Sequence, residues 1–440
     1  MDDAWLAELS EFLRIPSVSA DEAHAGDVQK AGEWVCEFVR GAGGEAGLVQ
    51  TERHPLAVAE LQASSGDGAP TVIVYGHFDV QPPAPLELWE SDPFEATVRG
   101  DRLYARGVAD DKGQLYMLLK AAQQLAAEKA LPVNLRVCCD GEEEIGGHSI
   151  VDFLAEDERG ADVCVIYDSA MLRRDLPVFN VATRGLAYFH LRVSTGKRDL
   201  HSGIYGGAAL NAMHALVQAL SAVLPREGRL PEPLRAGIAQ PTDAELAGWS
   251  ELAPGAEELA GQGARPADER AAEEFYLRTF AEPALDVNGI EGGSPHLQKT
   301  VLPVIAEANL SIRLAPGQDP ETIAGEVERL LRQAAPEGAE LELRRLSIAP
   351  AGLVDPESRA VQLGLDAFER ALGVRPLLVR SGGTLPIVPA LANKEIPTIL
   401  TGFALPDSNI HSPNENIPVE YVPLGVAAAR ELFTAFAGLG

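Results

Sequence analysis

Cysteine is scarce in this sequence. The 440 residues include 4 cysteines, and no two of them are separated by the two-residue spacing of common zinc and redox motifs. Cys138 and Cys139 are adjacent, and with Cys164 they lie in apolar runs, while Cys36 stands alone. We therefore expect reduced thiols in a core rather than disulfides or cysteine-bound metal. Such thiols are typical of a reducing compartment.

Positive charge is also scarce, with 36 lysines and arginines against 65 acidic residues and a formal charge of −29. Such a chain repels phosphate backbones and anionic lipid heads, so we expect neither nucleic acid nor a membrane as a partner. No continuous apolar run is long enough to span a bilayer. The first residues, Met1–Trp5, have neither the basic nor the apolar region of a secretory signal. We expect a cytoplasmic protein.

The order of helical and strand-like patterns predicts an α/β protein with more than one domain, since 440 residues exceed the usual size of one. Buried strand patterns alternate with helix-period segments through residue 183, and this texture returns after residue 350. Between them, amphipathic strands, helices (one of them predicted at about 207–224) and a proline- and glycine-rich stretch at 225–285 predict a separate α+β domain. The sequence thus divides into 1–183, an insertion at 184–350, and 351–440.

Three predicted buried strands run directly into a histidine or an acidic residue. In chain order these are 71–75 followed by His77, 133–139 followed by the acidic turn 140–144, and 162–167 followed by Asp168. In open α/β sheets, ligands and catalytic groups gather beyond the carboxyl ends of the strands. We therefore expect these side chains to share one edge of a sheet.

Each of these motifs also has a purely structural explanation. Asp79 lies two residues after His77 and can orient its imidazole, as beside a metal, but the pair alone is weak. Asp110 and Asp111 precede a predicted helix and could simply cap it. The run Glu142–Glu144 could be a solvated loop, although three consecutive carboxylates repel one another unless a cation offsets them. One of these glutamates could bind metal while its neighbour acts as a general base.

Taken together, the motifs supply a complete set of metal ligands. In chain order they supply a histidine, an aspartate, a glutamate, a second aspartate and a second histidine. Nitrogen and oxygen donors without sulfur suit Zn²⁺, Mn²⁺ or Co²⁺. Five such ligands exceed what one catalytic zinc requires, so a two-metal site is predicted. Two other histidines, His190 and His214, lie in a predicted strand and a predicted helix, where structural roles are favoured.

Six motifs in order along the chain resemble one known family. They are Gly76–Val80, Gly107–Gly113, Glu142–Gly146, Asp199–Gly203, Ser311–Leu314 and His411–Glu415. With these motifs the chain resembles the aminoacylase and carboxypeptidase G superfamily of co-catalytic metallopeptidases, and within it the cytosolic non-specific dipeptidase and carnosinase branch. The resemblance implies a zinc-peptidase-like catalytic domain in 1–183 and 351–440. It also implies a ferredoxin-like lid and dimerisation domain in 184–350.

The resemblance further implies a role for each motif residue. His77 and Asp168 would hold one metal ion, Glu144 and His411 the other, and Asp110, followed by a cis peptide bond, would bridge both. Asp79 would orient His77, and Glu143 would be the general base. In this family a lid histidine of the partner subunit stabilises the oxyanion, and His201 matches it. Residues that match the substrate-binding positions are Arg313, Ser381, Gly382, Gly383 and Thr384.

Three functions are compatible with these motifs. A broad-specificity dipeptidase is favoured by the segment 199–207 and by the long insertion. A deacylase of N-acyl amino acids, of the acetylornithine or succinyl-diaminopimelate type, is the alternative within enzymes. A metal-binding relative without catalysis is disfavoured, because such a protein has no need of a base at Glu143. The stretch 225–295 matches the family only loosely, so side-chain preference stays open. Pro413 stands at a position that is variable in the family, and no loss of function is expected from it. Metal identity also stays open, because sites of nitrogen and oxygen donors accept several metals.

Overall fold

The computed structural model describes residues 1–66 and 68–440 and divides into two compact units. Unit 1 comprises Met1–Val181, Val354–Val379 and Ala390–Gly440, and unit 2 comprises Ala182–Leu353 and Arg380–Pro389. The units differ from the predicted domains 1–183, 184–350 and 351–440 mainly at Arg380–Pro389, which groups with unit 2. Arg380–Pro389 begins at the last residue of β15 (Leu377–Arg380). The strand β15 pairs with β8 (Val178–Ala182), and the chain passes from β8 into unit 2.

Unit 1 is built on a mixed six-stranded sheet, as the α/β prediction requires. Its order is β1 (Glu45–Val49), β2 (Leu56–Leu61), β6 (Asn134–Asp140), β3 (Thr71–His77), β7 (Val163–Tyr167) and β16 (Thr398–Thr401). The last four strands are parallel, and the first two are antiparallel to their neighbours. The parallel strands are nearly continuous runs of buried apolar residues, which is the pattern of a sheet covered on both faces.

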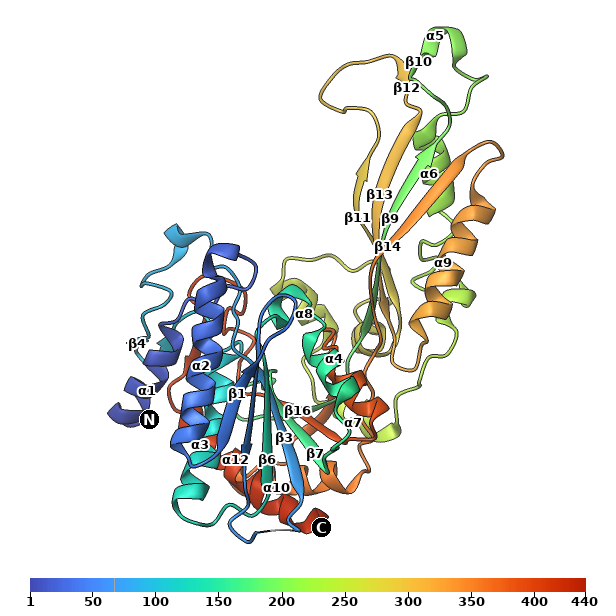
Figure 1. Cartoon of the computed structure of the whole chain (residues 1–440). Coiled ribbons are helices and arrows are strands. Elements are labelled where there is room, and N and C mark those ends of the chain that lie inside the picture. The colour runs from blue at the N-terminus through green and yellow to red at the C-terminus, as the bar shows by residue number, and fades with distance from the viewer. Residues whose placement is uncertain (67) are drawn as a thin grey trace. The chain divides into compact units, whose positions relative to one another are not determined.

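Helices cover this sheet and complete its core (Figure 1). They are α1 (Asp3–Leu13), α2 (Ala25–Gly41), α3 (Lys112–Ala127), α4 (Ser149–Glu156), α10 (Arg359–Leu372) and α12 (Tyr421–Phe436). A second, three-stranded sheet has the strand order β17 (Asn416–Pro418), β5 (Arg102–Tyr104) and β4 (Thr97–Arg99). A further helix, α11 (Ile387–Asn393), lies where the two units join in sequence. All 4 cysteines are free and buried, as expected from their apolar surroundings.

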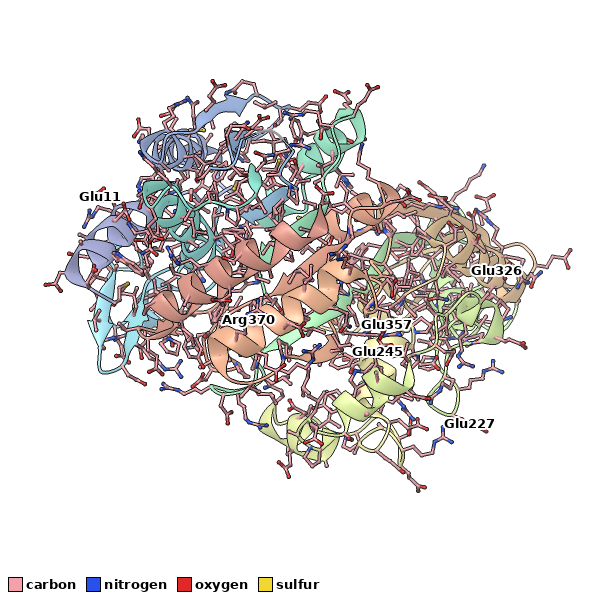
Figure 2. The ribbon with its side chains drawn as sticks, turned by 90° about the horizontal axis from the view of Figure 1, so that it is seen from below. Glu11, Glu227, Glu245, Glu326, Glu357 and Arg370 are labelled. Atoms are coloured by element: carbon pink, nitrogen blue, oxygen red, sulfur yellow. The ribbon has the colours of Figure 1, made fainter. Side chains whose placement is uncertain are left out.

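By length and composition alone, the segment Tyr421–Leu439 could cross a membrane. Its helix α12 instead packs against α3 and α10 and buries one apolar face, including Leu432, Phe433 and Phe436. Figure 2 shows α10 and α12 side by side. Arg370 of α10 forms an ion pair with Glu431 of α12 at 3.0 Å. Core packing therefore accounts for the hydropathy of this segment.

Unit 2 has a four-stranded antiparallel sheet with helices on one face. The sheet order is β11 (Ala284–Glu291), β13 (Ile305–Leu314), β9 (Gly185–Ser194) and β14 (Glu340–Ala349). Apolar residues of β9 and β13 alternate strictly and form a core with α6 (Ala212–Leu220) and α9 (Pro320–Ala334). The shorter elements are α5 (Ser202–Tyr205), α7 (Asp243–Trp249), α8 (Gly255–Gly261), and the pair β10 (Leu200–His201) and β12 (Val301–Leu302).

One helix prediction in unit 2 was wrong. The pattern over 207–224 predicted a single helix, but α6 covers only Ala212–Leu220. Asn211 accepts hydrogen bonds from the backbone N–H groups of Met213 and His214, so this side chain caps a helix that begins five residues later than expected.

We predict that Gly113→Ala destabilises the protein by about 1–3 kcal/mol. A Cβ at Gly113 would lie 2.0 Å from the carbonyl oxygen of Val108, so the start of α3 would have to shift. Gly26→Ala in α2 is the matched control, because nothing lies within 4 Å of its added Cβ. The control should leave stability unchanged or raise it by up to about 1 kcal/mol. Urea unfolding measures both, and equal midpoints for the two variants would contradict this packing argument.

Candidate metal centre

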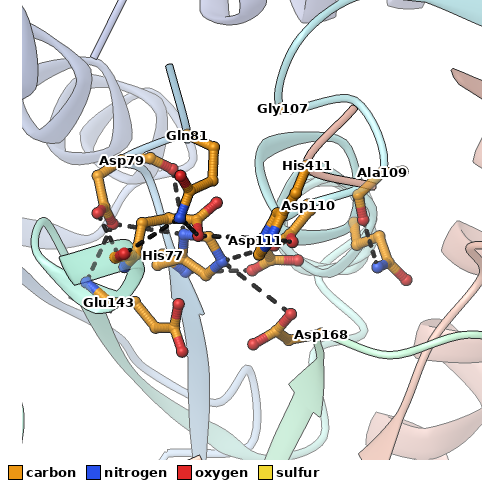
Figure 3. A network of polar contacts seen from close by, with 12 residues as sticks. His77, Asp79, Gln81, Gly107, Ala109, Asp110, Asp111, Glu143, Asp168 and His411 are labelled. Atoms are coloured by element: carbon orange, nitrogen blue, oxygen red, sulfur yellow. Dashed lines mark hydrogen bonds and ion pairs between the residues drawn. The ribbon is translucent and has the colours of Figure 1, made fainter. Parts of the chain in front are cut away.

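His77 ends strand β3 with its side chain fully buried at the carboxyl edge of the sheet. Its Nδ1 atom lies 3.1 Å from the carbonyl oxygen and 3.4 Å from the carboxylate of Asp79. Its Nε2 atom lies 2.9 Å from Asp110 Oδ1 and 4.0 Å from Asp168 Oδ1. The imidazole is therefore held from one side by Asp79 and faces two acidic residues on the other (Figure 3).

Asp79 also fixes the acidic turn that follows β6. Its two carboxylate oxygens accept the backbone N–H groups of Glu143 and Glu144 at 3.2 and 3.1 Å. The hydroxyl of Ser19 donates a third hydrogen bond, at 2.6 Å. Asp79 therefore positions His77 and the acidic turn together, which gives it a wider role than the predicted orientation of one imidazole.

Asp110 lies between two imidazoles. Its Oδ1 is 2.9 Å from His77 Nε2, and its Oδ2 is 2.9 Å from His411 Nε2. The peptide bond between Asp110 and Asp111 is cis, as the resemblance implied. Asp111 does occupy the N-cap position of α3, but its side chain does not cap the helix and accepts the His77 N–H at 3.1 Å instead. The capping explanation of this acidic pair is therefore wrong.

His411 reaches the cluster from a loop near the end of unit 1. Its Nε2 atom is 3.1 Å from Glu144 Oε2, in addition to its contact with Asp110. The backbone of His411 has a φ of 59°, and Asn409 and Asn414 nearby are also in the left-handed region. Three such residues within six positions are unusual outside glycine and often mark functional loops.

Two supporting residues were not predicted. Gln81 donates through Nε2 to Glu144 Oε2 at 2.9 Å, which orients that carboxylate. Glu415 is fully buried and accepts the N–H groups of Ala109 and Asp110 at 2.8 and 3.1 Å. Its other oxygen accepts from Gly107 at 3.1 Å and from the guanidinium of Arg106 at 2.6 Å. In the sequence, only the position of Glu415 four residues after His411 could have indicated a role at the metal centre.

The electrostatics of the cluster favour bound cations. Burial raises the pKa of Glu143 well above its ordinary value. Burial opposes charge on Asp110 too, but hydrogen bonds from His411 and His77 lower its pKa below the ordinary value. Hydrogen bonds to Asp110 and Glu144 raise the pKa of His411 to about 10. The imidazoles thus hold protons between carboxylates, and a divalent cation bound by the same atoms would take the place of these protons.

The donor set fits divalent cations. Ligand atoms of His77, Asp110 and Glu144 lie within 4.8 Å of one another. Glu144 Oε1 is buried without a hydrogen-bond partner in the described part of the chain, as expected of an oxygen whose partner is a cation. Asp168 approaches this group from the end of β7. Imidazole nitrogens with carboxylate oxygens suit Zn²⁺, Mn²⁺ or Co²⁺.

The residues predicted to bind substrate lie in unit 2. Arg313 donates through Nη1 to the hydroxyl of Thr384 at 3.0 Å, which joins β13 to the loop 381–384. Within that loop the Ser381 hydroxyl accepts the N–H of Gly383 at 3.1 Å. His201 is exposed and pairs with Val301, which precedes β13, whereas Arg313 lies near the other end of that strand. The structure thus brings Arg313 and Thr384 together and leaves His201 apart from them.

We predict that Glu415→Gln weakens the affinity for Zn²⁺ about 10–100-fold, because it disturbs the backbone that carries Asp110. The matched control is Asp157→Asn, which alters a part-buried ion pair of unit 1, with Arg136 at 2.5 Å. Both variants should be less stable, but only Glu415→Gln should bind zinc more weakly. Competition with a chromophoric chelator measures this affinity, and equal affinities in the two variants would refute the assignment.

Comparison with known proteins identifies relatives across the whole chain. The family model "Peptidase family M20/M25/M40" matches residues 73–435. Cysteinylglycine-S-conjugate dipeptidase of Corynebacterium striatum is 29% identical over 445 residues, covering 97% of this chain and 94% of the relative. The mouse Beta-Ala-His dipeptidase is 28% identical over 382 residues, covering 82% of this chain and 76% of the relative. Among solved structures, an M20 family metallo-carboxypeptidase from Sulfolobus solfataricus has a TM-score of 0.86 at 27% identity, covering 99% of this chain and 100% of that one.

Proposed function

Because this chain belongs to peptidase family M20/M25/M40, we propose that it hydrolyses the amide bond of dipeptides with two divalent cations. The observation that carries this proposal is the convergence of five distant segments of unit 1 on one cluster. The converging residues are His77, Asp110, Glu144, Asp168 and His411. The names of the dipeptidase relatives support the substrate class.

The geometry supports a specific division of ligands. His77 and Asp168 would hold one cation, and Glu144 and His411 the other. Asp110 would bind both, since its two oxygens each face a different imidazole at 2.9 Å. Zn²⁺ is the proposed metal, with Mn²⁺ or Co²⁺ as alternatives that the same donors accept.

Glu143 is the proposed general base. When bound, the cations would lower the pKa of a water molecule and polarise the scissile carbonyl. A carboxylate oxygen of Glu143 would accept a proton from this water and later pass it to the leaving amine. The backbone of Glu143 is fixed by Asp79, and burial raises its pKa, so its affinity for a proton is higher than that of an exposed glutamate.

Arg313 and the loop 381–384 are proposed to bind the substrate carboxylate, and His201 to stabilise the oxyanion in the site of a partner subunit. His201 belongs to β10, which pairs with β12 before the Ile305 end of β13, whereas Arg313 lies near the other end of β13. Figure 1 shows β10 and β12 at one end of the sheet of unit 2. At about 3.3 Å per residue, the eight steps along the strand from Ile305 to Arg313 span roughly 26 Å, far more than a dipeptide of roughly 7 Å. One copy of unit 2 therefore cannot offer both side chains to the same substrate.

A homodimer through unit 2 accounts for this separation. Ile204 and Tyr205, close to His201 in sequence, are 70% and 45% exposed. Other exposed apolar residues of unit 2 include Ile290, Leu297 and Ile305. Such exposure is typical of surfaces that are covered in an assembly. A second copy of unit 2 is the proposed cover, with unit 2 acting as lid and dimerisation domain.

The proposed location is the cytoplasm, since the four free buried thiols suit a reducing compartment.

We predict that the zinc-loaded protein hydrolyses a panel of free dipeptides and leaves N-acetyl amino acids intact. Glu143→Gln should lower kcat by at least about 100-fold, because it removes the proton acceptor while its backbone hydrogen bond to Asp79 is retained. Amino acid release with and without chelator is the measurement. Hydrolysis of N-acetyl amino acids alone would support the deacylase alternative, and equal rates for both proteins would exclude Glu143 as the base.

We predict that two inactive variants complement each other when mixed. His201→Ala and Glu143→Gln chains would form mixed dimers in which one of the two sites combines an intact Glu143 with an intact partner His201. After subunit exchange at equal concentrations, activity should recover to about a quarter of the wild-type value, because half of the dimers are mixed. If the mixture is no more active than its components, His201 does not act across a dimer.

A further inference from the structure

The side chain of Gln114, the third residue of α3, is buried and binds backbone groups of three separate segments. It is 1% exposed and comes directly after the motif Gly107–Gly113. Its Nε2 atom donates to the carbonyl oxygens of Ala109 and Ser169 at 2.7 and 3.1 Å. Its Oε1 atom accepts the backbone N–H of Phe403 at 2.5 Å. One amide thus joins three segments of unit 1 that lie far apart in the sequence.

Two of these segments carry proposed metal ligands. Ala109 immediately precedes Asp110, the residue proposed to bind both cations. Ser169 immediately follows Asp168, a proposed ligand of one cation. Gln114 therefore connects the backbone beside one ligand to the backbone beside another, and it does so through main-chain carbonyl groups.

The peptide group between Ala109 and Asp110 is held at both of its polar atoms. Its carbonyl oxygen accepts from Gln114 at 2.7 Å, and its N–H donates to Glu415 at 3.1 Å. A peptide group held in this way cannot rotate without losing a buried hydrogen bond, which costs free energy. The two supporting side chains therefore fix the direction from which Asp110 presents its carboxylate.

The backbone after Asp168 is closely packed as well as hydrogen-bonded. A Cβ added at Gly402 would lie 1.9 Å from the carbonyl oxygen of Ser169, which is the oxygen that accepts from Gln114. The hydroxyl of Ser169 accepts from Nδ2 of Asn180 at 2.9 Å. Ser169 therefore has little freedom to move while Gln114 is in place, and the backbone of Asp168 is restrained with it.

The chemistry of these three partners requires an amide. Carbonyl oxygens only accept hydrogen bonds and a backbone N–H only donates, so the side chain must offer two donors and one acceptor. Glutamate has the same shape but can donate at most one hydrogen, and methionine has a similar length but no donor. Among side chains of this length, glutamine alone satisfies all three groups.

We propose that Gln114 is a positioning residue that sets the spacing between the backbones of Asp110 and Asp168. Through this spacing it raises the affinity for the cation proposed to be held by His77 and Asp168. The inference rests on the proposed function, which makes Asp110 and Asp168 metal ligands, and it adds a residue outside the ligand set.

The cation proposed for Glu144 and His411 should be affected much less. Asp110, which both cations share, keeps its hydrogen bond to Glu415 when Gln114 is replaced. The loss of Gln114 is therefore expected to weaken the binding of one of two zinc ions and not of both.

The experiment measures the two stepwise dissociation constants for Zn²⁺ on the whole chain, by competition with a chromophoric chelator. Gln114→Met should weaken one of them about 10–100-fold, as is usual when a group that orients metal ligands is removed, and leave the other unchanged. Gln114→Glu keeps the acceptor for Phe403 but loses at least one donor, so it should weaken the same constant. It serves as the test if Gln114→Met does not fold.

Gln318→Met is the matched control, because Gln318 of unit 2 is 4% exposed and has the same kinds of partner. Its Nε2 atom donates to the carbonyl oxygens of Leu234 and Ala236 at 3.1 and 2.9 Å. Its Oε1 atom accepts the N–H of Ala315 at 2.9 Å. Both methionine variants lose the same set of hydrogen bonds, so urea unfolding should show a comparable loss of stability. Only Gln114→Met should bind zinc more weakly.

A double-mutant cycle tests whether Gln114 acts through Asp168. In an Asp168→Ala background the spacing to that ligand no longer matters, so Gln114→Met should have little further effect on zinc affinity. If the two substitutions instead weaken zinc binding additively, Gln114 does not position Asp168 and the proposal is wrong.

Equal zinc constants in the wild-type protein and in Gln114→Met would also overturn the proposal. An equal weakening in Gln318→Met would do the same, because the effect would then come from a general loss of stability. The proposed function is tested separately, by dipeptide turnover and by the number of zinc ions that the wild-type protein binds. Two bound ions with unchanged constants in Gln114→Met would refute only the role of Gln114.

Discussion

Negative charge confined to a small, buried volume is the constraint around which unit 1 is arranged. Five carboxylates surround two imidazoles at the carboxyl edge of the sheet: Asp79, Asp110, Glu143, Glu144 and Asp168. Burial and mutual repulsion both oppose ionisation of such a group. Positive charge must offset them, and protonated histidines can do so only in part. The cluster is therefore most stable when divalent cations occupy it, and the surrounding fold keeps its members in place until they do.

Two carboxylates outside the proposed ligand set provide much of that restraint. Asp79 accepts the backbone N–H groups of Glu143 and Glu144, and Glu415 accepts those of Ala109 and Asp110. In both cases a buried acidic side chain binds the main chain that carries a proposed ligand, not the ligand side chain itself. This fixes the position of the ligand's backbone, so only side-chain rotation is left to be settled when a cation binds.

The predictability of each site residue from the sequence depended on where it lies. His77 and Asp168 follow buried parallel strands, whose apolar runs are visible in the sequence and whose ends share one edge. Asp110 and His411 lie in turns without periodic pattern, so only the motifs of the family resemblance revealed them. Glu415 was missed because its partners are backbone N–H groups more than 300 positions away, which no local pattern can indicate. The alternating strands β9 and β13 were readily predicted, whereas the helix at 207–224 was overextended because a capping side chain overrode the apolar pattern.

The insertion of unit 2 between two parts of unit 1 has a consequence for synthesis of the chain. Proteins emerge from the ribosome amino-terminus first. His77, Asp110, Glu144 and Asp168 therefore emerge early, while His411, Glu415 and the sheet strand β16 follow only after the whole of the insertion. A nascent chain thus carries four of the five proposed ligands for much of its translation before the fifth is added. On the ligand assignment proposed above, the set of metal ligands is complete only near the end of translation, after His411 has been added.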